Sequence, residues 1–294
     1  MLSDLLPSWQ LAMRAERKAD KTITSYTEGV RRFLKWCEDT GTPPELTATT
    51  VQAFIAHLLD HGAEASTALS RQKALRQYAG WLVREGELEA NPLLGLKPPK
   101  QDKKVTHALT DDQIRALLKA CQGKTLRDRR DEAVVRLMVE TGLRAAETVA
   151  LQVSDVDLSR GLAVIQKGKG GKGRVVPFGP QTAAALDRYI RARRVHNLAD
   201  TPALWVGARN GRAFTYPGLD KALRQRASDA GIERFHLHLL RHTYAHRWLR
   251  AGGSEQGLMA VAGWANRAML DRYTSSSASE RAADEARNLG LGDL

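Results

Sequence analysis

Residues 91–110 read NPLLGLKPPKQDKKVTHALT, and this stretch divides the chain into two parts. Its three prolines lack a backbone N–H, and each disfavours helix in the residue before it. Its four lysines, between residues 97 and 104, keep the backbone in water. The pattern predicts an extended, basic, proline-containing linker over residues 91–105.

The length of 294 residues agrees with such a division, because single hydrophobic cores stop growing near this size. We therefore expect a first domain at residues 1–90, a second domain at 106–273 and a C-terminal tail at 274–294. The tail carries leucines at positions 289, 291 and 294, which could dock on a neighbouring protomer; a frayed terminus is the alternative.

Before the linker, apolar residues recur at helical spacing almost throughout. Three such runs cover residues 23–34, 51–59 and 69–83, and each is followed by a glycine that can end a helix. A further helix is expected near residues 9–17. The first domain is thus predicted to be a four-helix bundle.

After the linker the pattern is mixed. Three short β-branched segments bounded by turn residues predict a small antiparallel three-stranded sheet at residues 151–157, 161–166 and 174–178. Helices are predicted at residues 110–120, 131–141, 182–195, 216–230, 239–251 and 254–262. The predicted fold class is therefore multidomain and mainly α, with an N-terminal four-helix bundle and an α+β second domain.

The composition fits a soluble protein with a packed core, since 43% of residues are hydrophobic and 27% are charged. The sequence has no apolar run long enough to span a membrane, and its first residues do not resemble a secretory signal. The two cysteines, Cys37 and Cys121, are too few for a disulfide framework. We expect a cytoplasmic protein.

Net charge is unevenly distributed. Residues 1–100 carry 13 basic and 12 acidic side chains, so +11 of the net +12 falls in residues 101–294. A basic excess of this size favours a polyanionic partner, and nucleic acid is preferred to a membrane because no basic amphipathic helix with an aromatic face is present. The basic linker then either lies along phosphates or is a solvated tether.

Hydroxyl and cationic side chains at or near the predicted helix starts of the first domain are candidates for phosphate contacts. Serines and threonines at such places also cap helices without any ligand, which is the alternative. The candidates are Thr24, Ser25, Arg71, Lys73 and Arg76.

A glycine-rich segment, KGKGGKGR, occupies residues 167–174. It does not fit a nucleotide-binding P-loop, which needs Ser or Thr after its Lys and then a helix, whereas a strand is predicted here. A hairpin tip fits better, because glycines permit a tight turn and close approach to a partner. Lys172 and Arg174 could then reach phosphates; a solvated basic turn is the alternative.

The segment HLLRH places His238 and Arg241 on one side of a helix start. Histidines at 238, 242 and 246 also have the spacing of a metal stripe. The zinc-binding motif of metalloproteases, H-E-x-x-H, has Glu directly after the first His, whereas this chain has Leu239 there. We therefore expect no metal, and we also expect no cofactor. Helix capping and packing is the alternative role for the histidine pair.

Two further segments complete the set of chemical groups. In TGLRAAE, at residues 141–147, Arg144 follows a helix-ending glycine, and Glu147 is expected to pair with a cation. In GWANRAMLDRY, at residues 263–273, Tyr273 follows Trp264 by nine residues. Two arginines, a hairpin lysine, a histidine and a late tyrosine are what phosphodiester chemistry without a metal requires.

These motifs in this order resemble the tyrosine recombinase (phage integrase) family. The strings TGLRAAE, GKGGKGRVVPF, HLLRHTYAHRWLRAG and GWANRAMLDRYT carry the resemblance across residues 110–274. The bundle is similar to the family's core-binding domain, and the length is similar to that of two-domain Xer-type members. At position 264 the chain is similar to Cre, which also has Trp at this position. Most family members have a second catalytic His there.

The resemblance implies a role for each matched residue. Tyr273 would attack the scissile phosphate, Arg144 and Arg241 would hold its oxygens, and His238 would take or relay the tyrosine proton. Lys169, or alternatively Lys167, would protonate the leaving 5′-oxygen. Trp264 would orient a phosphate oxygen or be a core aromatic, since indole cannot act as an acid or base. His242 would contact DNA.

The implied activity is site-specific DNA recombination through a 3′-phosphotyrosyl intermediate. Such enzymes clamp duplex DNA between two domains and work as tetramers on two inverted-repeat core sites through a Holliday junction. The alternatives are a type IB topoisomerase-like nicking-closing enzyme and a DNA-binding regulator that does not cleave. The sequence names neither the DNA target nor an accessory protein, and it does not separate a phage or plasmid integrase from a dimer-resolution enzyme or a transposon resolvase.

Overall fold

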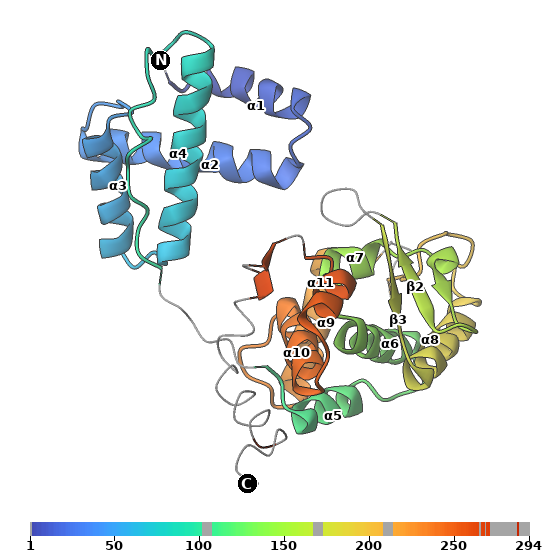
Figure 1. Cartoon of the computed structure of the whole chain (residues 1–294). Helices are drawn as coiled ribbons and strands as arrows, with labels where there is room; N and C mark the ends of the chain where they lie inside the picture. The colour runs from blue at the N-terminus through green and yellow to red at the C-terminus, as the bar shows by residue number, and fades with distance from the viewer. Residues whose placement is uncertain are drawn as a thin grey trace. The chain divides into compact units, whose positions relative to one another are not determined.

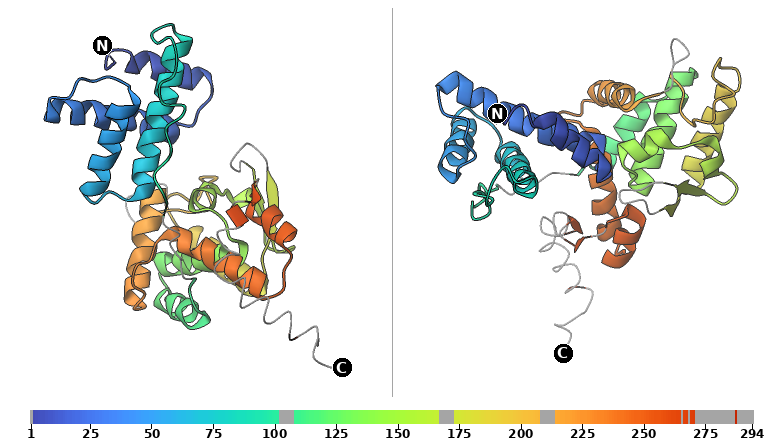
Figure 2. Two further views of the ribbon diagram at one scale, coloured as in Figure 1. Left: turned by 60° about the vertical axis from the view of Figure 1, so that its left-hand side comes forward. Right: turned by 90° about the horizontal axis from the view of Figure 1, so that it is seen from above.

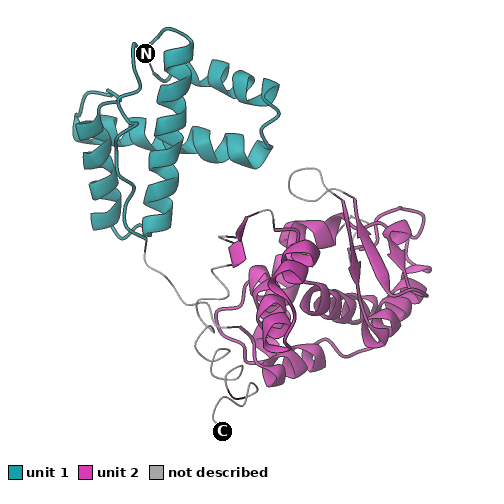
Figure 3. Cartoon of the chain, in the orientation of Figure 1, with its two compact units in different colours: residues 1–104 teal, residues 105–294 magenta. Residues whose placement is uncertain are grey.

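The computed structural model describes residues 2–101, 108–166, 173–207, 214–264, 266, 267, 269, 270 and 287. The chain divides into two units, residues 1–104 and 105–294 (Figures 1 and 3), each with its own buried core. Among the described residues, no helix is both long enough and apolar enough to cross a bilayer.

Unit 1 is the four-helix bundle that the apolar spacing predicts (Figures 1 and 2). Its helices are α1 (Leu6–Ala15), α2 (Asp20–Thr40), α3 (Ala48–Asp60) and α4 (Ala65–Arg84). Aromatic rings fill its core: Phe33 on α2 meets Phe54 on α3 edge to face, with ring centroids 5.5 Å apart. α2 and α4 approach closely at Gly29, where an added Cβ would stand 2.5 Å from the Cβ of Ala74.

The chain after α4 packs back onto this helix. Leu93 and Leu96 are buried in the core of unit 1. Gln72 Nε2 donates to the carbonyl oxygens of Leu96 and Lys97, at 3.3 and 3.1 Å. A solvated linker was expected for these residues. The difference arises because Leu93 and Leu96, which lie between the prolines, join the apolar core of unit 1.

Unit 2 is built around α6 (Leu126–Thr141), which packs against α5 (Asp111–Ala120), α8 (Pro180–Arg193), α9 (Tyr216–Asp229) and α10 (Leu237–Arg250). Burial on every side explains why Ala133, Val134, Val135, Leu137 and Met138 are all at most 1% exposed. α11 (Glu255–Ala262) follows α10, and both contribute to a smaller cluster around Tyr244 and Leu258.

Within the described residues, the sheet has three antiparallel strands in the order β1-β2-β3, as predicted. They are β1 (Val156–Asp157), β2 (Leu162–Ile165) and β3 (Arg174–Pro177). The register pairs Ile165 with Arg174, so Arg174 lies at the end of the β2–β3 ladder.

The secondary structure differs from the prediction most clearly in three places. The predicted strand at 151–157 is a 3₁₀ turn, η1 (Val153–Asp155), followed by two strand residues; the Asp155 side chain accepts from the backbone N–H of Gln152 at 2.8 Å and closes this turn. α7 (Ala145–Ala150) was not predicted, because six residues are too few to show a period. α6 begins at Leu126, before the predicted residue 131, owing to a capping box between Thr125 and Asp128.

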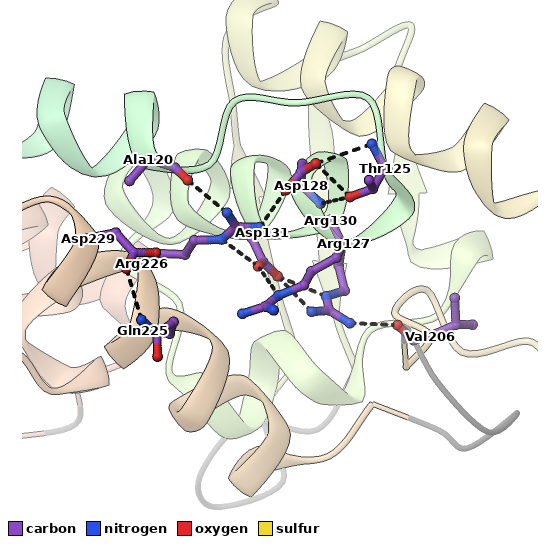
Figure 4. Close-up of polar contacts among 10 residues, drawn as sticks. All are labelled: Ala120, Thr125, Arg127, Asp128, Arg130, Asp131, Val206, Gln225, Arg226 and Asp229. Atoms are coloured by element: carbon purple, nitrogen blue, oxygen red, sulfur yellow. Dashed lines mark hydrogen bonds and ion pairs between the residues drawn. The ribbon is translucent and has the colours of Figure 1, made fainter.

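A buried ion-pair network fixes α6 to α9 and is shown in Figure 4. Asp131 on α6 is 1% exposed, and its carboxylate accepts from Arg130 at 2.8 Å and from Arg226 of α9 at 3.0 Å. Arg226 also donates to Asp128 at 2.7 Å and to the carbonyl of Ala120 at 2.8 Å. A buried carboxylate is tolerated here because cations surround it.

Candidate active site

Arg144 is placed by a tight turn at the end of α6. Gly142 has φ +62°, and a Cβ there would collide with the ring of Tyr244 on α10. The left-handed turn buries Leu143 and makes Arg144 the residue that precedes α7. The glycine therefore sets the direction in which the Arg144 side chain leaves the backbone.

Glu147 holds Arg144 from one turn further along α7. Its carboxylate accepts from the backbone N–H of Arg144 at 2.9 Å and from Arg144 Nη1 at 2.7 Å. The Glu147 side chain is 6% exposed and that of Arg144 is 24% exposed. The expected pairing of Glu147 with a cation is confirmed.

Arg174, at the start of β3, binds the same carboxylate. Its Nη1 and Nη2 donate to Glu147 Oε1 and Oε2 at 3.1 and 2.7 Å. Burial raises the pKa of Glu147, but hydrogen bonds from Arg174 and Arg144 outweigh burial and lower the pKa to about 2. Glu147 is therefore ionised at neutral pH.

Arg241 on α10 is almost fully enclosed, with 1% of its surface exposed. Its Nη1 donates to the carbonyl of Gly142 and its Nη2 to the carbonyl of Ala262, both at 2.7 Å. The guanidinium also lies over the ring of Trp264, 5.3 Å from the centroid, a cation–π contact. Arg241 thus connects the turn before Arg144 to the end of α11.

Three consecutive carbonyl groups at the end of α11 each accept from a different arginine. Val261 O accepts from Arg174 Nε at 2.7 Å, Ala262 O from Arg241, and Gly263 O from Arg144 Nη2 at 3.1 Å. The last carbonyls of a helix carry partial negative charge and have no partner within the helix. This helix end therefore gathers Arg144, Arg174 and Arg241 into one site, the arginine cluster.

Trp264 belongs to the same site but is packed as a core residue. It is 6% exposed and lies in the cluster formed with Tyr244, Leu258 and Leu270. This packing agrees with the alternative interpretation of Trp264 as a core aromatic. A contact with a phosphate oxygen stays a prediction.

The two histidines of the α10 motif differ in environment. His238 lies in the first turn of α10 and is exposed, whereas His242, one turn further, is 7% exposed. Burial, followed by the charges of His238 and His246, lowers the pKa of His242 to about 4, so this ring is neutral at pH 7. A neutral ring can contact DNA by a hydrogen bond but adds no charge.

Four sequence-predicted residues lie outside the described residues: Tyr273, Lys169, its alternative Lys167, and Lys172. In unit 1, Thr24 and Ser25 are exposed on α2 and Lys73 is exposed on α4. Arg71 Nη1 donates to the carbonyl of Ser25 at 3.5 Å, and Arg76 Nη2 donates to the carbonyl of Leu96 at 2.6 Å. Their contacts with DNA stay predictions.

Sequence reasoning missed part of the support of this site. Tyr244 shapes the turn at Gly142, and Gly263 ends α11 with φ +64°. A glycine after a helical run does signal a helix end, so the position of Gly263 was detectable. The carbonyl acceptors have no signature in the sequence, because every residue carries one.

Comparison with known proteins agrees with this fold. The phage integrase family matches residues 107–280, and the N-terminal SAM-like domain of phage integrases matches residues 5–86. Together they define a tyrosine site-specific recombinase. The chain belongs to the phage integrase family, which confirms the predicted family and fold class.

Similar proteins include the tyrosine recombinase XerC of Chromobacterium violaceum, 36% identical over 232 residues that cover 79% of this chain and 76% of the relative. The crystal structure of XerA recombinase has 26% identity, a TM-score of 0.56 and coverage of 97% of this chain and 99% of that chain. A lambda integrase tetramer bound to a Holliday junction shares the fold at 15% identity, with a TM-score of 0.69 and coverage of 90% and 77%.

Proposed function

We propose that this recombinase cuts and rejoins DNA through a covalent link to Tyr273. The arrangement that carries the proposal is the arginine cluster, in which Arg144 and Arg241 are held by Glu147 and the end of α11. Guanidinium groups are permanently charged, forked donors suited to phosphate oxygens. A lysine at position 144 or 241 would supply a point charge but not two parallel N–H donors. We therefore do not expect lysine to support cleavage in place of either arginine.

The chemistry balances without an external energy source. The Tyr273 oxygen forms a bond to phosphorus while the bond from phosphorus to the 5′-oxygen breaks. The phenol proton passes to His238, and the leaving 5′-oxygen takes a proton from Lys169, or from Lys167 in the alternative assignment. Arg144 and Arg241 stabilise the negative charge that grows on the phosphoryl oxygens. Rejoining is the reverse reaction, because the phosphotyrosyl link conserves the ester bond.

Duplex DNA is the proposed partner, with inverted-repeat core sites. The excess of positive charge in residues 101–294 supports it, as do the exposed side chains of Thr24, Ser25 and Lys73 on unit 1. Arg71 and Lys172 would add cations to this contact. Binding should weaken steeply as salt rises, in proportion to the phosphates contacted.

We further propose a homotetramer on two DNA sites, with strand exchange through a Holliday junction. The lambda integrase structure with the same fold is a tetramer bound to a Holliday junction, which supports this proposal. Residues 274–294 are the proposed docking segment between protomers. The described part of unit 2 has a groove of about 1050 Å³, lined by apolar residues such as Ile114 and Leu118 and by charged residues such as Glu140 and Arg247. We propose this groove as the place where the segment docks.

The experiment that tests the proposed function is covalent capture. DNA fragments that flank the gene are incubated with the full chain, and SDS-resistant adducts are collected and shortened to the smallest reactive duplex, called here the core duplex. We expect an inverted repeat, and a plasmid with two such sites should be inverted or resolved in the presence of EDTA. Loss of cleavage in EDTA would contradict a mechanism by these side chains alone.

The same experiment separates the two alternatives. A topoisomerase-like enzyme would form adducts on any duplex and would relax supercoiled DNA without exchanging strands between sites. A regulator that does not cleave would protect DNA from a nuclease but would give no adduct. Either result would contradict the proposed function.

A further inference from the structure

Arg174 has the contacts of a structural arginine, although the sequence suggested a phosphate contact. Its Nε donates to Val261 O, and its Nη1 and Nη2 donate to the two oxygens of Glu147. The side chain is 11% exposed, compared with 24% for Arg144. The guanidinium edge that would meet a phosphate is thus turned toward a carboxylate.

Glu147 lies between two guanidinium groups. Its Oε1 accepts from both Arg144 Nη1 and Arg174 Nη1. With Arg174 present, the three side chains carry a net charge of +1. Without Arg174, Glu147 would pair with Arg144 alone and offset its charge, at the place where the proposed function requires Arg144 to attract a phosphate.

Arg174 also links three parts of unit 2 mechanically. It starts β3, binds Glu147 of α7, and binds the end of α11. Gly263 leaves space for it: a Cβ at position 263 would stand 3.1 Å from Arg174 Nη1. The carbonyl of the same glycine accepts from Arg144. A shift of Arg174 would therefore displace Arg144 in two ways, through Glu147 and through the Gly263 carbonyl at the end of α11.

We propose that Arg174 is a positioning residue for DNA cleavage: by neutralising Glu147 and fixing the end of α11, it leaves Arg144 with an effective positive charge in a fixed place. This inference rests on the proposed function, in which Arg144 binds the scissile phosphate. It differs from the predicted role of Arg174 as a DNA contact, because Arg174 then acts through Glu147 and never touches the phosphate.

A double-mutant cycle tests this role. Single-turnover adduct formation on the core duplex is measured for Arg174→Ala, Glu147→Gln and the double variant. We expect Arg174→Ala to slow adduct formation on the order of 10²-fold, and the added Glu147→Gln to restore about tenfold of that loss, because no carboxylate then offsets Arg144. A double variant as slow as Arg174→Ala, or slower, would contradict the proposal.

The matched control is Arg188→Ala. Arg188 shares Glu132 with Arg136, at 3.0 and 2.8 Å, so it has the same Arg–Glu–Arg pattern away from the arginine cluster. We expect its adduct rate to equal that of the wild type. A loss as large as that of Arg174→Ala would mean that any such pairing in unit 2 affects cleavage, and would overturn a special role for Arg174.

A binding measurement covers the outcome in which Arg174→Ala folds poorly. Affinity for a short duplex of random sequence is measured over a range of salt for Arg144→Ala and for the same variant with Arg174→Gln added, so that the charge of Arg144 does not contribute to the difference. A lost phosphate contact lowers the slope of log affinity against log salt by about 1. We expect an unchanged slope, and a fall of about 1 would overturn the proposal. A wild type that forms no adduct would contradict the proposed function instead, while this slope would still decide the role of Arg174.

Discussion

At the scale of single residues, the charge of Glu147 organises the described site. One carboxylate accepts from the backbone and side chain of Arg144 and from two nitrogens of Arg174. A carboxylate beside a phosphate would normally repel it. The cations around Glu147 outnumber its charge, so the site as a whole stays positive.

The lowered pKa of Glu147 predicts a specific dependence of stability on pH. Its pKa falls from 4.5 to about 2 on folding, so the ionised form stabilises the fold above pH 4.5. This contribution is lost as pH falls from about 4.5 toward 2. Glu147→Gln should therefore be less stable than the wild type at pH 7, and the difference should shrink at pH 3, as measured by urea unfolding.

Comparing two proteins removes the effect of other carboxylates. Asp128 and Asp157 also have lowered pKa values, but both residues are present in the wild type and in the variant. Parallel stability profiles of the two proteins between pH 7 and pH 3 would contradict the ion pairing that we describe.

The sequence alone predicted two of the three arginines of the arginine cluster as catalytic residues. Arg144 and Arg241 stood out because each follows a recognisable helix signal, and the structure brings them to one helix end. Arg174 was interpreted as a DNA contact because its neighbours in the sequence are glycines and lysines. Its partner in the structure, Glu147, lies 27 residues earlier, and only the folded chain brings the two together. A contact of Arg174 with DNA stays a prediction.

At the scale of elements, the turn between α6 and α7 determines where Arg144 lies. The turn needs a positive φ at Gly142 and a close approach to Tyr244. α7 itself has only six residues, and η1 is a single turn, so neither shows a sequence period. Long helices with apolar faces were predictable; short elements held by side-chain caps and tertiary contacts were not.

Gly142→Ala tests the importance of this turn. The alanine must adopt a left-handed conformation, which costs about 1–2 kcal/mol, and must displace the Tyr244 ring, which adds about 1–3 kcal/mol. We expect both lower stability in urea and slower adduct formation, because Arg144 is displaced.

Gly231→Ala is the matched control. Gly231 has φ +70°, but an added Cβ there would have no atom within 4 Å. This variant should lose only the conformational part of the stability and should keep the wild-type adduct rate. Equal effects of the two substitutions on adduct formation would contradict a positioning role for the turn.

The ion-pair network between α6 and α9 (Figure 4) predicts that replacing one carboxylate oxygen of Asp131 by an amide NH₂ lowers the stability of the fold strongly. Asp131→Asn leaves Arg130, which is 3% exposed, with a neutral partner. Removing one partner of a buried pair costs about 3–5 kcal/mol. Asp187→Asn, in the exposed pair with Arg191, should cost less than about 1 kcal/mol. Urea unfolding of both variants decides this, and similar losses would contradict the importance of burial.

At the scale of the whole molecule, positive charge is concentrated after residue 100. Residues 101–294 hold nearly all of the positive excess, and they include the arginine cluster. The sequence predicted the helical first unit and the mixed second unit, because amphipathic periods extend over many residues. It did not predict that Leu93 and Leu96 pack into unit 1, since an apolar pair in a proline-rich stretch has no period.

The central claim is that this chain breaks DNA with the hydroxyl of Tyr273, and mapping of the trapped adduct tests it most directly. Wild type and Tyr273→Phe are incubated with the core duplex, denatured in SDS, digested with protease and nuclease, and analysed by mass spectrometry. We expect the wild type to carry a nucleotide phosphate on Tyr273, and the Phe variant to bind the duplex with unchanged affinity but form no adduct. An adduct that persists in Tyr273→Phe, or that maps to another residue in the wild type, would contradict the claim.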